Sequence, residues 1–174
     1  METFAQPHLE LDQWTGAAQG GGRGVLDALA HVHDDIRTQL AAATAEPEPI
    51  GEAARHLAKV CLPHLALVEE TAFPAFAMLQ TLFSGGERAD SSELLALIDD
   101  FSGSHDDLIK QNQSMVFVID PLWEAAYEEG NREVVAFTRN LRSHKRIEEQ
   151  VLFPVLLLIG KYLQKKLAIS GGDV

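Results

Sequence analysis

At 174 residues, with 46% hydrophobic and 23% charged residues, the chain is long enough for one domain with a sizeable core. Its formal net charge of −12 argues against nucleic acids and anionic membranes as partners, because both bind basic surfaces. The sequence does not open with a basic and apolar leader, and its most apolar run, VLFPVLLLIG, is too short to cross a bilayer. A cytoplasmic location is therefore expected.

Taken in chain order, the sequence predicts an N-terminal arm over 1–23, a helical domain over 24–168 and a tail over 169–174. Glycines and a proline in the arm disfavour regular structure. Within the domain we expect helices over about 24–44, 50–82, 91–118 and 131–168, with Pro121 opening a short extra helix to about 129. Ser91 or Ser92 is expected to cap the third helix. The predicted fold is all-α, an up-down-up-down antiparallel four-helix bundle.

The single cysteine, Cys61, lies in an apolar run of the second predicted helix. One cysteine cannot form an internal disulfide bond. A small buried side chain is therefore expected at this position, in preference to a reactive thiol.

Histidines occupy positions where the helical pattern expects apolar residues. Apolar residues recur at steps of three and four, and His33, His105 and His144 fall on these stripes, together with Glu148. The surrounding segments are also repeated. VHDDIRTQ resembles SHDDLIKQ, and HLALVEETAFPAF, which begins at His64, resembles HKRIEEQVLFPVL, which begins at His144. The chain thus reads as two copies of a helical hairpin, in which four histidines can converge at one level.

The pair His144 and Glu148 indicates a metal site. Four residues along a helix correspond to a rotation of about 40°, so both side chains face the same way. A buried carboxylate must be paired or must hold a metal ion. Imidazoles with carboxylates suit a transition metal, iron above all, and two ions if a carboxylate bridges them. Proline at 154 should kink the fourth helix just beyond Glu148, and Phe73 and Phe153 are expected to cover the site with apolar surface.

A single buried histidine is more often a hydrogen-bonded core residue than a ligand, but the twofold repetition favours the metal interpretation. The remaining histidines, His8, His31 and His56, are predicted to lie outside the site. Glu70 and Glu149 are interpreted as solvated or supporting residues.

These motifs, in this order and at this spacing, resemble the hemerythrin-like, or HHE cation-binding, family over about 25–168. The resemblance implies an up-down four-helix bundle with a carboxylate-bridged non-haem di-iron centre. It also implies binding or sensing of oxygen, of a related diatomic such as NO, or of iron itself. At the matching positions the implied iron ligands are His33, His64, His105, His144 and Glu148.

The sequence departs from the family pattern at two positions. Val68 stands where the family usually has a glutamate, and Ile109 stands where oxygen carriers have a fifth histidine. Glu69 is the nearest acid, and a distortion caused by Pro63 and Pro74 could turn it inward, so it is included as a candidate ligand. A di-iron centre with altered coordination, a single-ion site and a weak site all remain open.

Two other functions are alternatives. A di-iron oxidase or peroxidase of ferritin type would use Glu-x-x-His pairs, whereas this chain has the reverse order, His-x-x-x-Glu. A metal-free interaction module, such as a histidine phosphotransfer domain, needs an exposed histidine. A binding or sensing role is preferred to an enzymatic one, and a homodimer is left open.

Overall fold

The computed structural model describes residues 24–83 and 90–170, so the predicted arm over 1–23 and residues 171–174 of the predicted tail lie outside it. All of the regular elements in these two ranges are helices, which confirms the predicted all-α class. They are listed here in chain order: α2 (Val25–Thr44), α3 (Ile50–Thr71), α4 (Phe73–Phe83), α5 (Ser91–Glu128), α6 (Arg132–Ile147), the π-helix η2 (Glu148–Leu152) and α7 (Phe153–Ser170).

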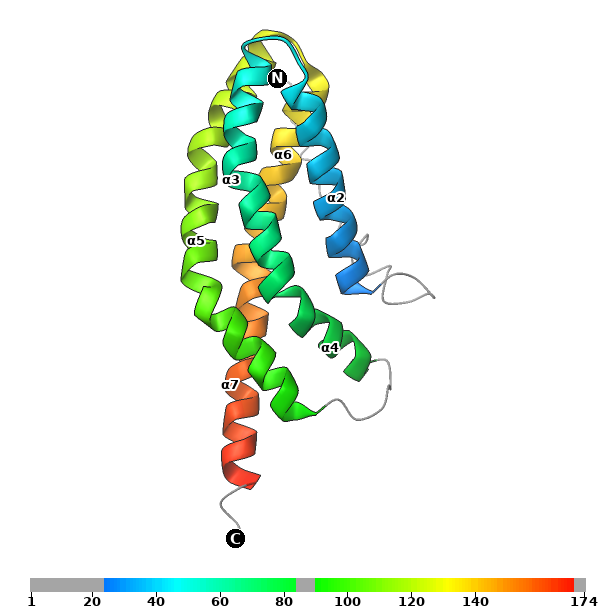
Figure 1. Cartoon of the computed structure of the whole chain (residues 1–174), viewed down its shortest axis with the longest axis vertical. Helices are drawn as coiled ribbons and strands as arrows, with labels where there is room; N and C mark the ends of the chain where they lie inside the picture. Colours follow the sequence, from blue (N-terminus) through cyan, green and yellow to red (C-terminus); the bar gives the residue numbers. More distant parts are fainter. Residues whose placement is uncertain (1–23, 84–89, 171–174) are drawn as a thin grey trace, which may run out of the picture.

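The helices are arranged as a bundle around one long axis (Figure 1). Helices α2 and α3 meet at one end of the bundle, and α5 and α6 meet at the same end. The elements α6, η2 and α7 follow one another as a single long rod, while α4 diverges from the end of α3. Helix α3 packs on α2 and on α5, and helix α6 also packs on α2 and on α5. Four rods therefore surround a common core.

Polar side chains define where two of the helices begin. Asp90 accepts a hydrogen bond from the Ser92 amide at 2.9 Å and caps α5, so the prediction of Ser91 or Ser92 as the cap was wrong by one or two residues. Asn131 accepts a hydrogen bond from the Val134 amide at 3.1 Å and caps α6. Both caps satisfy amides that have no partner within the first helical turn.

Two predicted helix boundaries were wrong. The extra helix opened by Pro121 does not exist, because α5 runs through Pro121 to Glu128. Pro121 has no amide proton to donate to the carbonyl of Phe117. Pro121 and Phe117 are both exposed, so water can satisfy that carbonyl. Ile119 and Leu122, on the inner face, stay in the core. Conversely, the predicted helix over 50–82 is divided at Ala72 into α3 and α4. Pro74 is the second residue of α4, where its missing amide proton costs nothing.

The core consists of two apolar clusters along the bundle axis. The first, here the upper cluster, includes Ile36, Leu65, Met115 and Leu141. The second, here the lower cluster, includes Leu29, Val68, Leu108 and Leu152. No described helix is long and apolar enough to span a membrane.

Replacing Phe137 with alanine should destabilise the fold. Phe137 is 2% exposed in the upper cluster, so Phe137→Ala should lower the free energy of unfolding by about 3–5 kcal/mol. Phe117→Ala is a matched control, because Phe117 is 79% exposed and its loss should change stability by less than about 0.5 kcal/mol. Urea denaturation followed by circular dichroism measures both. Equal effects of the two variants would contradict this assignment of the core.

Cys61 is fully buried in the upper cluster, as the sequence predicted. Burial and, next, the charge of Glu148 raise the pKa of Cys61 to about 12. The thiolate is the reactive form, so a thiol reagent at pH 8 should label Cys61 in urea and leave the native protein unmodified. Labelling of the native protein at the rate seen for the denatured chain would show that the upper cluster is open to solvent.

Candidate metal centre

A layer of buried polar residues separates the two apolar clusters. His33, His64, His144 and Glu148 are each at most 7% exposed. Along its helix, His33 lies between Leu29 of the lower cluster and Ile36 of the upper one. His144 and Glu148 likewise follow Leu141 and precede Leu152. Histidines from three rods thus face one another in the middle of the core.

The Glu148 carboxylate lies at the centre of this layer. Its Oε1 is 3.6 Å from His33 Nε2 and 3.2 Å from His144 Nε2. Its other oxygen, Oε2, is 3.1 Å from His64 Nε2. One carboxylate is therefore surrounded by three imidazoles that come from α2, α3 and α6.

The imidazoles keep this carboxylate ionised. Burial opposes ionisation of Glu148, but the neighbouring histidines, His144 foremost and then His33 and His64, outweigh it. The pKa of Glu148 consequently lies well below its usual range. The layer therefore holds an ionised carboxylate inside the bundle, and a carboxylate beside imidazoles is a ligand for a metal ion.

Glu148 is the first residue of the π-helix, and proline explains why the helix is distorted here. Pro154 has no amide proton to donate to the Gln150 carbonyl, as the sequence indicated. The Phe153 amide instead donates to the carbonyl of Glu148, five residues earlier. Such π-turns often occur at functional sites, since the extra residue per turn redirects a side chain. The sequence predicted a kink just beyond Glu148, and the structure shows a π-turn that begins at Glu148 itself.

Glu69 reaches the centre through His33. Its Oε1 is 2.9 Å from His33 Nδ1, and its Oε2 accepts a hydrogen bond of 2.7 Å from Arg37 Nη2. Burial disfavours the charge on Glu69, but hydrogen bonds from Arg37 and His33 outweigh it and lower its pKa. A carboxylate on Nδ1 fixes the ring so that Nε2 points to the opposite side, where Glu148 lies. Glu69 thereby orients a histidine of the centre.

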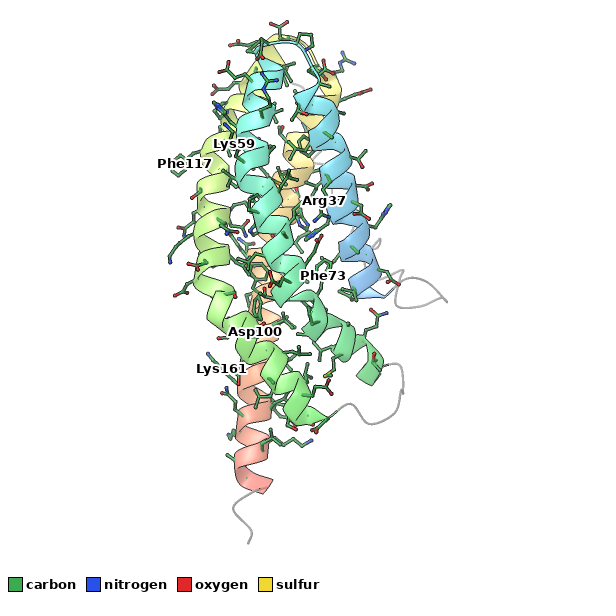
Figure 2. All side chains as sticks on the ribbon, viewed as in Figure 1. Arg37, Lys59, Phe73, Asp100, Phe117 and Lys161 are labelled. Atoms are coloured by element: carbon green, nitrogen blue, oxygen red, sulfur yellow. The ribbon has the colours of Figure 1, made fainter. Side chains whose placement is uncertain are left out.

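Sequence reasoning missed Arg37, although a signal for it existed. Arg37 lies one helical turn after His33 and therefore on the same face of α2. The hydrogen bond to Glu69 raises the pKa of Arg37. Figure 2 labels Arg37 and Phe73 between α2 and α3. The Phe73 ring lies 5.1 Å from the His33 ring, which covers that side of the layer with apolar surface.

His105 takes a different place from the other three predicted histidine ligands. Its side chain is 26% exposed, and its Nδ1 lies 3.7 Å from Asp106 Oδ1. Its ring packs at 5.9 Å from Phe101 and at 6.1 Å from Phe153. Within residues 24–83 and 90–170, no hydrogen bond, ion pair or ring contact joins His105 to Glu148 or to the other three histidines.

Three ligand atoms converge in an arrangement that suits a cation. Of the residues that the structure describes, His33, His144 and Glu148 form a group whose candidate ligand atoms lie within 4.8 Å of one another. His33 Nε2, His144 Nε2 and Glu148 Oε1 are all buried, and their mutual contacts of 3.2 and 3.6 Å do not have the geometry of hydrogen bonds. Unpartnered buried polar atoms are costly, and a shared metal ion would satisfy all three. The donor set, two imidazoles and one carboxylate, therefore fits a metal.

These features define a class of protein, a helical bundle with a buried His/Glu cation site. The model of the hemerythrin HHE cation-binding domain matches residues 25–156, and the chain belongs to this family. Comparison with curated proteins and with solved structures gave no match. The family membership suggested by the sequence motifs is thus confirmed.

Removing Glu69 should weaken metal binding. Glu69→Ala frees the His33 ring, and loss of such an orienting carboxylate typically costs about 10–100-fold in metal affinity. Glu70→Ala is the matched control, because Glu70 is the adjacent residue and is exposed. Anaerobic titration with Fe²⁺ against a chromophoric chelator measures both affinities. Unchanged affinity in Glu69→Ala would show that His33 needs no such support.

Proposed function

We propose that this chain is a non-haem iron protein that binds or senses oxygen or a related diatomic such as NO. The observation that carries the proposal is the convergence of His33, His144 and Glu148 on one point inside the bundle. Two imidazoles with one carboxylate are a ligand set typical of non-haem iron, and they leave further coordination positions open. Iron, when bound, supplies the redox-active centre that these residues lack.

The protein side chains hold the ion and keep it apart from solvent. His33, His64 and Glu148 are at most 1% exposed. Phe73 packs on His33 and covers that side of the site with apolar surface. Such an apolar wall limits the access of water and slows solvent-driven oxidation.

The positions of the imidazoles favour one strong ion site and one weaker site. His33, His144 and Glu148 Oε1 provide three protein donors for the first ion. A second ion, as in a carboxylate-bridged pair, has His64 Nε2 and Glu148 Oε2 as its nearest donors. Val68 replaces the glutamate that would add another. We therefore propose tight binding of one iron, which His33, His144 and Glu148 would hold, and weaker binding of a second, for which His64 and Glu148 would supply the donors.

Burial favours a binding or sensing role over an oxidase or peroxidase role. An enzyme of that kind that oxidises an organic substrate must admit this substrate to the ion. The residues around Glu148 are almost without exposed surface, which suits a diatomic molecule better than a larger substrate. The same burial disfavours phosphotransfer to His33, His64 or His144, since a histidine phosphotransfer module presents its histidine to a partner protein.

Elemental analysis of protein purified without added metal tests the proposal. Iron should dominate, and the reduced protein should change its visible absorption on addition of oxygen. Glu148→Gln removes the central charge and should reduce the iron content at least about tenfold, since it removes a ligand. His56→Ala is the control on an exposed position of α3 and should retain full iron.

The role of His105 can be tested in the same series. Its implied role as an iron ligand rests on the family resemblance, whereas its described contacts are with Asp106, Phe101 and Phe153. We expect His105→Ala to retain most of the iron. Retention of full iron by Glu148→Gln, or no iron in the wild-type protein, would overturn the proposed function.

A further inference from the structure

Asn112 is a buried polar residue of α5 that neither the sequence motifs nor the proposed iron site accounts for. It is 0% exposed. Both Oδ1 and Nδ2 of its carboxamide are buried without a hydrogen-bond partner. Leaving a buried amide unpaired is unfavourable, so an asparagine at this position requires an explanation.

The position of Asn112 along α5 places it in the polar layer. It follows Leu108 of the lower cluster and precedes Met115 of the upper cluster. His33 occupies the corresponding position on α2, between Leu29 and Ile36. Because α5 packs on both α3 and α6, this position places Asn112 at the level along the bundle that His64 and His144 occupy on those helices.

The other buried positions of α5 show which type of side chain packing alone favours. The buried side chains on either side of Asn112 are apolar, and they are Phe101, Leu108, Met115 and Ile119. A leucine at 112 would continue this stripe without an unpaired amide. Asparagine at this position thus favours a ligand-binding role.

A ligand-binding asparagine has two candidate roles: to hold the metal ion itself, or to hydrogen-bond a small molecule bound at the ion. The chemistry of the amide separates them. Carbonyl oxygens suit hard cations such as Mg²⁺ or Ca²⁺, whereas imidazoles suit iron. A carboxamide can, however, donate from Nδ2 and accept at Oδ1 at the same time. It is therefore suited to a small molecule or anion that occupies an open coordination position of the centre.

We propose that Asn112 is the protein's hydrogen-bonding residue for the small exogenous ligand of the iron centre. The proposal rests on the proposed function, because it needs iron held by His33, His144 and Glu148 with a position left open. In this proposal Asn112 binds the incoming ligand, and the affinity for the ion is set by His33, His144 and Glu148 on the other helices.

Azide binding to the iron-loaded, oxidised protein tests this proposal, with the azide-dependent visible absorption as the readout. Asn112→Leu should keep the iron content of the wild type and weaken azide binding about tenfold, the effect of losing one hydrogen bond to a charged ligand. Asn112→Asp has the same shape, and its ionised carboxylate has no donor and repels the azide anion, so it should weaken azide binding at least as much. Gln113→Leu is the matched control, an amide-to-leucine change at the adjacent exposed position.

The outcomes separate this proposal from the one on which it rests. Absence of iron from the wild-type protein would overturn the iron function and this proposal with it, whereas absence of azide binding to the iron-loaded wild-type protein would overturn the role of Asn112 alone. Wild-type azide affinity in Asn112→Leu, with iron intact, would overturn the role of Asn112 alone. Loss of iron from folded Asn112→Leu, checked by circular dichroism, would also overturn it, because Asn112 would then hold the ion itself.

Discussion

The structure depends on one buried carboxylate. Glu148 is kept ionised inside the bundle because imidazoles from three rods approach its two oxygens. Without such partners, a charge at this depth would be too costly to bury. The relative heights of α2, α3 and α6 are therefore constrained at the level of Glu148, and the two apolar clusters pack above and below that level.

Proline controls the local geometry from which this carboxylate projects. Pro154 removes a hydrogen bond just after Glu148, and the backbone responds with a π-turn over Glu148–Leu152 while the rod continues as α7. The corresponding Phe-Pro pair at the end of α3 has a different effect, since α3 ends at Thr71 and α4 begins at Phe73. The same motif therefore accompanies a π-turn within one rod and the end of the other rod.

The two repeated halves have diverged in what they contribute to the centre. In the first half, His33 is oriented by Glu69 and Arg37, which lie outside the group of converging ligand atoms. In the second half, His105 packs near Asp106 and two phenylalanines instead. Asn112, seven residues later and about 10 Å further along the helix, enters the layer from α5. The pattern of motifs is symmetric, but the donor set in the core is not.

Periodicity and motif spacing alone predicted the helical class, the burial of Cys61 and the pairing of His144 with Glu148, whereas the family was identified by the resemblance of the motifs to known ones. These properties follow from contacts within a few residues along one helix, which a sequence displays directly. The tertiary structure decided how Glu69 and Arg37 meet His33, that α5 continues through Pro121, and that Asn112 rather than His105 lies between the two clusters. These outcomes depend on the axial register of one rod against another. That register is set by the packing of both apolar clusters together, and no local sequence pattern contains it.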